Sequence, residues 1–448
     1  MQRLRIKKGF QAKLAGLPAD SRIDLPPPEQ VAVCPVAIES VKPRLLVKEK
    51  DQIRLGEPIF EDKARPNLKF LSPGGGTVAD IRFGPRRVVE HVAIDLAEDE
   101  NPVDLPRLSA DQLAAAERGT VVQHLIDGGL WPLVRALPFR DIADETQTPP
   151  ALFVFLDDLE PFQPDPEVYL KGRLGDFAFG LKVLEKLCPA VTVCAHRRHK
   201  ALVETIDTNR LLLLDGRYPA PDPGVVLYHT RKSSDQNSSW YAYGQDLLMM
   251  AELFASGRYP IMRTFSVGGS GAGSAQHVQT RLGTPVGDLL NGSSPDGPQR
   301  YLAGGIYRGR PVAPDSFLGL HEVALTVIPE GDNREFMALF KPGWTKPTYS
   351  RAYLSKLNPE ILNYNCNRHG GLRACIACMH CADVCPVDIL PNLTYKAILA
   401  EEVEEYLQHG LLDCVECGLC SFVCPSKLEL TETLVKAKRQ YRKEREGA

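Results

Sequence analysis

Two cysteine runs near the C-terminal end constrain this chain more than any other feature. Each has the spacing C-x-x-C-x-x-C-x-x-x-C-P, and their cysteines are Cys375, Cys378, Cys381 and Cys385, then Cys414, Cys417, Cys420 and Cys424. Three thiolates at this spacing in a tight loop can converge on three corners of one iron–sulfur cube. The fourth cysteine, a turn later and stopped by proline, points away. The runs therefore predict two [4Fe-4S] clusters and one-electron chemistry.

The spacing resembles that of bacterial two-cluster ferredoxins, in which the fourth cysteine of each run binds the other cluster. The resemblance implies two crossed ligand sets: Cys375, Cys378, Cys381 and Cys424 for one cluster, and Cys414, Cys417, Cys420 and Cys385 for the other. Zinc is the alternative, since paired C-x-x-C motifs also build four-ligand sites. Zinc ribbons need neither the third cysteine nor the proline, so clusters are the favoured interpretation. No residue is assigned a catalytic acid–base role.

The segments around the second run have helical periodicity. Leu399, Val403 and Tyr406 recur at helical spacing, and Gly410 stands where a C-cap belongs. We therefore expect a helix between the runs, another over 428–445, and a helical two-cluster module over 346–448. The basic run 436–445 is interpreted as a solvated helix end, and the net charge of -3 gives no indication of nucleic-acid binding.

The other cysteines are scattered and are expected to be core thiols; they are Cys34, Cys188, Cys194 and Cys366. A metal site is the alternative for two of them, through His196 and His199 near Cys194, or through His369 near Cys366. Neither group supplies a complete ligand set at standard spacing.

Residues 1–105 contain short apolar runs separated by glycine and proline, which favours an all-β domain. Phe60–Ala64 and Leu71–Val78 resemble a lipoyl or biotinyl carrier fold, a barrel-sandwich hybrid. In such carriers a lysine at a hairpin tip holds the prosthetic group. Whether Lys63 is modified is left open, and the favoured interpretation is a sandwich retained without that chemistry.

Residues 106–255 alternate between helical and strand patterns, which predicts an α/β, Rossmann-like domain with buried strands at Ala151–Leu156 and Ala190–Cys194. Asp157, Asp158 and Glu160 follow the first of these strands directly. Open α/β sheets bind ligands at this edge. The favoured interpretation of the three acids is nevertheless a solvated turn, with a docking or site role as the alternative.

The segment 256–345 contains a glycine-rich stretch, Val267–Ser274, that lacks both the G-x-G-x-x-G register and a P-loop lysine. It is predicted to be a β-turn. Thr284 and Pro285 are expected to open a short helix ending at Leu290, which with the flanking strands suggests a β-grasp, SLBB-like unit. Lys341–Pro347 is expected to link this unit to the cluster module.

Several stretches resemble the A subunit of the sodium-translocating NADH:quinone oxidoreductase: Ile6–Phe10, Phe60–Phe70, Arg82–Ile94, Gly129–Phe139, Val384–Pro391 and Phe422–Lys427. The chain departs from that family in carrying all eight cluster cysteines, a set typical of the Rnf complex C subunit. The resemblance implies a multidomain α+β chain with four parts: a β-sandwich, an α/β domain, a β-grasp domain and a helical ferredoxin module.

Function follows from the same resemblance. It implies a peripheral electron-transfer subunit on the cytoplasmic side of the cell inner membrane, bound to the membrane subunits of an Nqr/Rnf-like quinone reductase, with quinone such as ubiquinone at a subunit interface. No stretch reaches the roughly 18 apolar residues of a membrane helix, and the N-terminus lacks an export signal. The segment Gly128–Phe139 is bulky where a flavin loop would need glycine, so no flavin is expected. The alternatives are a flavin- and NADH-binding role and a mainly structural role.

Overall fold

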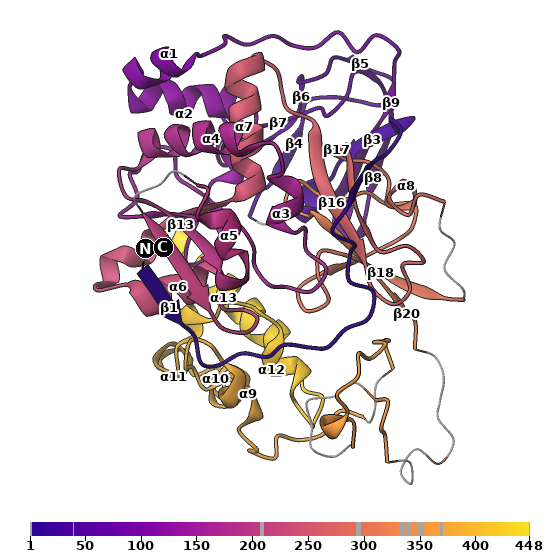
Figure 1. The fold of residues 1–448 in the computed structure, drawn as a ribbon, viewed down its shortest axis with the longest axis vertical. Coiled ribbons are helices and arrows are strands. Elements are labelled where there is room, and N and C mark those ends of the chain that lie inside the picture. The colour runs from indigo at the N-terminus through magenta and orange to yellow at the C-terminus, as the bar shows by residue number, and fades with distance from the viewer. Residues whose placement is uncertain are drawn as a thin grey trace.

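The computed structural model describes residues 2–38, 40–206, 210–292, 297–331, 337, 342–346, 354–367 and 371–447. Its strands form four sheets, of seven, six, four and three strands, and most helices lie in the α/β part and at the C-terminal end. The C-terminal module lies against the α/β part on the side away from the small β-sheets (Figure 1). In the described residues, no helix is both long and apolar enough to cross a membrane.

The two smaller sheets form the expected β-sandwich. Their orders are β3-β9-β8-β5 and β4-β6-β7, with β3 (Gln30–Val33), β9 (Val89–Leu96), β8 (Gly76–Phe83), β5 (Gln52–Ile53), β4 (Pro43–Leu45), β6 (Pro58–Asp62) and β7 (Lys69–Leu71). Phe60 stacks on Phe70 with ring centroids 4.4 Å apart, and Val31, Val78 and Ile94 are buried with them. Lys63 is exposed in the hairpin between β6 and β7.

The α/β part is built on the seven-stranded sheet, in the order β1-β14-β13-β12-β15-β10-β11. The strands are β1 (Gln2–Arg5), β14 (Leu211–Asp215), β13 (Val191–His196), β12 (Leu152–Phe155), β15 (Trp240–Tyr243), β10 (Arg135–Ala136) and β11 (Asp141–Ile142). Every residue of β12 is buried, as the continuous apolar run predicts for a parallel strand covered on both faces.

Helices cover this sheet: α1 (Ala110–Ala115), α2 (Arg118–Asp127), α3 (Pro166–Tyr169), α4 (Leu174–Leu187), α5 (Lys200–Val203), α6 (Pro223–Thr230) and α7 (Gly244–Ser256). The two buried strands predicted from sequence are thus confirmed as β12 and β13. The sheet also contains β1, from the very start of the chain, in parallel register with β14. The sheets therefore do not follow a division at residue 105.

The six-stranded sheet has the order β19-β18-β20-β16-β17-β2. Its strands are β19 (Arg310–Val312), β18 (Gln299–Ala303), β20 (Ala324–Pro329), β16 (Met262–Gly268), β17 (Gln276–Arg281) and β2 (Arg22–Asp24), with α8 (Val286–Leu289) after β17. The glycine-rich stretch ends β16 and forms the turn into its antiparallel partner β17, in agreement with the predicted β-turn, and Gly269 at φ 107 donates its N–H to the Gly16 carbonyl.

The C-terminal module is helical, with α9 (His380–Val384), α10 (Pro391–Leu399), α11 (Val403–Gln408), α12 (Leu419–Phe422) and α13 (Leu430–Gly447). The single helix predicted between the runs is wrong in detail, because the chain breaks at Glu401 in the left-handed region, φ 59. Leu399 and Val403, expected on its buried face, are 64% and 44% exposed. Of the predicted linker, Lys341 and Pro347 lie outside the described residues.

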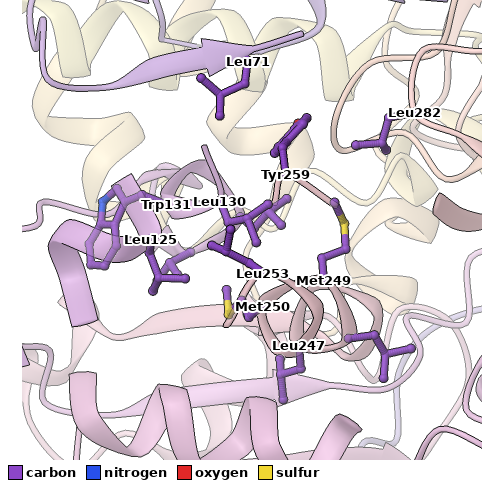
Figure 2. Packing of buried hydrophobic residues seen from close by; sticks show 14 of the residues in the cluster. Leu71, Leu125, Leu130, Trp131, Leu247, Met249, Met250, Leu253, Tyr259 and Leu282 are labelled. Atoms are coloured by element: carbon purple, nitrogen blue, oxygen red, sulfur yellow. The ribbon is translucent and has the colours of Figure 1, made fainter. Parts of the chain in front are cut away.

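One apolar core joins the first three parts of the chain. Leu71 of the sandwich, Trp131 and Leu253 of the α/β part, and Leu282 after β17 belong to the same buried cluster. Figure 2 shows these side chains around α7 and the segment after α2. Gly129 is at φ 66, and a Cβ there would meet Leu71 at 2.7 Å. The sandwich therefore packs tightly on the α/β part at this glycine.

Candidate metal centre

The thiols of the two runs line two adjoining cavities. One hollow of about 350 Å³, open to solvent in part, is lined by Cys385, Cys414, Cys417 and Cys420. The other, about 330 Å³, is lined by Cys375, Cys378 and Cys424. Cys381 lines both. Each cavity thus takes the fourth cysteine of the opposite run, which is the arrangement expected from crossed ligation.

We name the cavities by their exposure. The outer set is Cys375, Cys378, Cys381 and Cys424, of which Cys378 is exposed. The inner set is Cys385, Cys414, Cys417 and Cys420, of which the first two are buried and the others half-buried. That these sets bind clusters stays a prediction, tested below.

The two loops share the same unusual backbone. Ala377 and Met379 flank the second cysteine of the first run at φ 51 and 63, and Glu416 and Gly418 flank that of the second run at φ 57 and 79. A residue other than glycine in the left-handed region costs of order 1–3 kcal/mol and persists only where its surroundings enforce it. Bends repeated at matching positions wrap the loop around its cavity and turn the thiols inward.

Burial raises the pKa of the Cys385 thiol to about 12, and also raises that of Cys381 and Cys414. A raised pKa keeps these thiols protonated when no metal is bound, so a bound cluster would have to supply the positive charge that holds them as thiolates. Among the described residues, no group of His, Cys, Asp or Glu is gathered for a single metal ion. Each cavity is lined by at least four thiols, the number of cysteine ligands that a [4Fe-4S] cluster takes.

Three side chains donate to backbone carbonyls of the inner loop. Lys438 Nζ lies 2.8 Å from the Cys414 oxygen, Arg140 Nη2 3.0 Å from that of Val415, and Tyr218 OH 2.8 Å from that of Cys417. Lys438 comes from α13, whereas Arg140 and Tyr218 come from the α/β part. The inner loop is thus held from two sides.

Sequence reasoning missed these residues, and for Lys438 it was wrong. The basic run was interpreted as solvated, yet Lys438 is only 2% exposed. A signal was available, because Leu430, Leu434 and Lys438 recur every four residues and so share one helix face. Arg140 and Tyr218 carry no such pattern, because their contacts with the inner loop span very long separations in the sequence.

The acids after β12 are not a solvated turn, so the favoured interpretation was wrong. Asp157 and Glu160 are buried, and Arg308, after β18, bridges three carboxylates. Arg308 Nη2 lies 2.6 Å from Asp158 and Nη1 lies 3.1 Å from Asp222, while the Arg308 backbone N–H donates to Glu160 at 2.9 Å. The structure instead pairs these acids with Arg308 of the same chain, and it does not test the alternative of a docking or site role.

The remaining cysteines agree with the expectation of core thiols. Cys34, Cys188 and Cys194 are buried and Cys366 is half-buried. Near Cys194, His196 Nε2 contacts the Gly216 carbonyl at 3.1 Å and His199 Nδ1 contacts Glu167 at 3.0 Å, so both rings have protein partners. His369 lies outside the described residues.

The segment Gly128–Phe139 serves packing. Gly128 ends α2, and a Cβ on it would meet the Leu253 side chain at 2.3 Å. Trp131 is fully buried and donates its indole N–H to the Ala143 carbonyl at 2.9 Å. The bulky residues noted in the sequence therefore fill the core.

Comparison with known proteins covers almost the whole chain. Family models match residues 4–97 as an NqrA N-terminal barrel-sandwich hybrid domain, 116–259 as an NqrA second alpha/beta domain and 374–428 as a 4Fe-4S dicluster domain. A solved NAD+-reducing [NiFe]-hydrogenase chain matches with 12% identity over 51% of this chain and 52% of its own, at a TM-score of 0.35, too low to support an argument.

Curated relatives match over both full lengths. The A subunit of the Na(+)-translocating NADH-quinone reductase of Saccharophagus degradans is 30% identical over 431 residues, 95% of this chain and 96% of its own. The proteins of the same name from Alcanivorax borkumensis and Klebsiella pneumoniae match to the same extent. The chain therefore belongs to the family of the A subunit of the Na(+)-translocating NADH-quinone reductase, and it carries a 4Fe-4S dicluster domain.

Proposed function

We propose that this chain is a peripheral electron-transfer subunit of a membrane-bound, ion-translocating Nqr/Rnf-like oxidoreductase, relaying electrons from NADH or ferredoxin toward quinone through two [4Fe-4S] clusters. The observation that carries the proposal is the pair of adjoining cavities, each lined by thiols from both runs. The curated relatives are subunits of a Na(+)-translocating NADH-quinone reductase, which suggests the reaction and the transported ion.

The proposed ligands are the outer and inner sets as defined above. When bound, each cluster accepts and releases one electron. The protein's part is to hold the two centres close together. Cys381 lines both cavities, so the centres are neighbours, and apolar side chains such as Val387 and Leu434 line the inner one.

The proposal extends to partners and domains. We place the chain on the cytoplasmic side of the inner membrane, against membrane subunits, with quinone at a subunit interface. The domain divisions proposed are 1–105, 106–255, 256–345 and 346–448, the third an SLBB-like β-grasp domain, although β1 and β2 of the first segment join the sheets of the second and third. Three features support the SLBB-like assignment. The strands β16 and β17 are antiparallel, α8 follows β17, and β20 pairs in parallel with β16 and antiparallel with β18.

Two rivals make different predictions. A flavin- and NADH-binding role requires flavin on this chain, whereas the packed segment 128–139 favours none. A structural role, in which the metal only fastens helices together, requires no electron transfer. The exposure of Cys378 favours the relay, because a cluster bound by this thiol would lie within reach of a redox partner.

The test is anaerobic purification of the full chain followed by iron and sulfide analysis, electron paramagnetic resonance of the reduced protein, and absorbance for flavin. We expect about eight iron atoms per chain and two interacting paramagnetic centres, as two four-iron cubes require. The variants C378S and C417S should each lose one centre and stop quinone reduction by the assembled complex. C366S, outside both sets, is the control. Zinc in place of iron, or unchanged turnover in both variants, would refute the relay.

A further inference from the structure

The inner loop has donors on three of four consecutive backbone carbonyls. These are the carbonyls of Cys414, Val415 and Cys417, contacted by Lys438, Arg140 and Tyr218. All three donors are well shielded: Tyr218 is fully buried, Lys438 nearly so, and the Arg140 side chain is 16% exposed. Two of them carry a full positive charge.

The outer loop is in a different setting. Its Ile376 is 66% exposed and Cys378 is exposed. The donor to the neighbouring Ala374 carbonyl is the neutral hydroxyl of Ser426, at 2.9 Å, and the cation beside Cys381 is Lys8, which is 40% exposed and donates to the Ala382 carbonyl at 3.1 Å. Cluster potentials respond to hydrogen bonds, local charge and solvent exposure. Two thiols of each set are buried, but Cys378 of the outer set is exposed and no thiol of the inner set is. Water at Cys378 would stabilise the added negative charge of a reduced outer centre, so this difference alone would make the inner centre harder to reduce than its neighbour.

We propose that Lys438, Arg140 and Tyr218 form a donor collar that raises the reduction potential of the inner cluster and so offsets its burial. The inference rests on the proposed function, since it requires both clusters. Fixed positive charge and oriented N–H and O–H dipoles stabilise the electron that reduction adds. The collar thus keeps the inner centre able to exchange electrons with the outer one.

Two carboxylates beside the collar oppose its effect on the potential, and they provide a second, independent test of the proposal. Glu416 lies in the same loop and accepts from Lys438 at 2.9 Å, and Asp222 pairs with Arg140 at 2.8 Å. These carboxylates cancel part of the positive charge. Neutralising Glu416 should therefore raise the inner potential, whereas neutralising Lys438 should lower it. Loosened packing would not produce opposite shifts from two partners of one ion pair.

The three donors of the collar come from two parts of the chain. Lys438 belongs to the cluster module, whereas Tyr218 and Arg140 belong to the α/β part. The collar therefore gives the α/β part a role in the redox properties of the chain. Tyr218→Phe tests that role alone, because it removes one hydroxyl and leaves the stacking of this ring on Tyr307, at 5.1 Å, in place.

The experiment is potentiometric titration of the reduced full chain, prepared anaerobically with both clusters and followed by electron paramagnetic resonance. The signals are assigned with C378S, which removes an outer ligand. Lys438→Met should lower the reduced-to-oxidised ratio of the inner cluster about tenfold at a fixed potential, about 59 mV for one electron. Tyr218→Phe should lower it by a smaller factor, and Glu416→Gln should raise it. The outer cluster should be unaffected.

Lys436→Met is the matched control, because Lys436 lies on the same helix, is 72% exposed and pairs with Glu432. Its inner potential should equal that of the wild type. The proposal is overturned if Lys438→Met and Tyr218→Phe both match this control, or if Glu416→Gln lowers the potential. If Lys438→Met fails to fold, the other two variants decide. A wild-type chain without two reducible centres refutes the proposed function instead, so the two failures are distinct.

Discussion

Replacing Arg308 with methionine tests how the six-stranded sheet is fastened to the α/β part. The guanidinium reaches across to Asp158 and Glu160 after β12 and to Asp222 at the start of α6. Glu160 and Asp222 are 4% and 0% exposed, so their charges cannot be solvated when the arginine is lost. Methionine keeps the length and apolar stem of the side chain and removes only the charge and the donors.

The expected loss of stability depends on the hydrogen-bond partners that the carboxylates keep when Arg308 is replaced. Breaking a buried ion pair by removing one partner costs about 3–5 kcal/mol. Here Asp222 keeps Arg140, and Glu160 keeps the backbone N–H groups of Tyr307 and residue 308, at 2.9 Å each. We therefore expect the lower end, about 3 kcal/mol. An exposed pair of the same kind contributes about 0–1 kcal/mol, so the two cases are easily separated.

Hydrogen exchange followed by mass spectrometry is the appropriate assay, because a global unfolding midpoint is poorly defined for a multidomain chain. A loss of about 3 kcal/mol makes exchange through local opening roughly a hundredfold faster. The faster exchange should be confined to residues 157–165 and 304–309. Arg300→Met is the control, since Arg300 pairs with Glu330 at the surface and is 44% exposed. Exchange in Arg308→Met within about threefold of wild type would refute the reasoning.

Three further predictions follow from the same structure. Although burial opposes it, hydrogen bonds from Arg281 and the Gly75 N–H hold the pKa of Glu100 below its usual value. Its stabilisation is therefore present above the unfolded pKa and is lost as the pH falls through the folded one. Glu100→Gln should therefore reduce the loss of hydrogen-exchange protection around Gly75 at acid pH, after correction for the intrinsic pH dependence of exchange; an unchanged loss contradicts this. Gly129→Ala should destabilise the sandwich contact by about 1–3 kcal/mol, because the new Cβ meets Leu71 and overpacks the core. Proteolysis of the sandwich should then be faster than in the control Gly172→Ala, where the space around the Cβ is open. Equal rates of proteolysis in the two variants would contradict this prediction. Removing iron with a chelator under air should loosen the cluster module while the β-sandwich persists, seen as protease cuts after residue 371 only; cuts throughout the chain would contradict it.

Patterns of short range predicted much of this fold. The apolar run at β12 and the turn chemistry of the β16–β17 hairpin are decided by neighbours in sequence, and both predictions hold. Both features depend on local geometry, which a single sequence records directly. The thiols of each predicted ligand set line a common cavity, but the crossed pairing came from the resemblance to two-cluster ferredoxins and stays a prediction.

What depends on distant contacts could not be predicted in the same way. Nothing near Leu399 shows that the chain would bend at Glu401 and leave that leucine exposed. Asp158 is a residue type that is common in surface turns. Its position in the structure is explained only by its ion pair with Arg308, 150 residues away. A buried charge cannot be predicted from sequence until its partner is known, because burying an unpaired charge costs too much free energy.

The carboxyl ends of the parallel strands explain how the parts of this chain work together. Asp158 and Glu160 follow β12, and Tyr218 and Asp222 follow β14, so all four lie at the edge where open α/β sheets bind ligands. Here that edge is occupied by protein. Arg308 fills it from the six-stranded sheet, and Tyr218 and the Asp222–Arg140 pair contact the inner loop of the cluster module.

This arrangement changes what the α/β part can contribute. An edge that holds two neighbouring domains leaves less room for a nucleotide, which supports the proposal that electrons enter and leave this chain through the clusters. Asp222 is bound by both Arg308 and Arg140, so the joint to the six-stranded sheet and the collar of the inner loop share one carboxylate. A change at the joint should therefore reach the inner cluster: Arg308→Met should shift the inner potential upward or downward while Arg300→Met leaves it unchanged. Identical potentials in both variants would show that the two are independent.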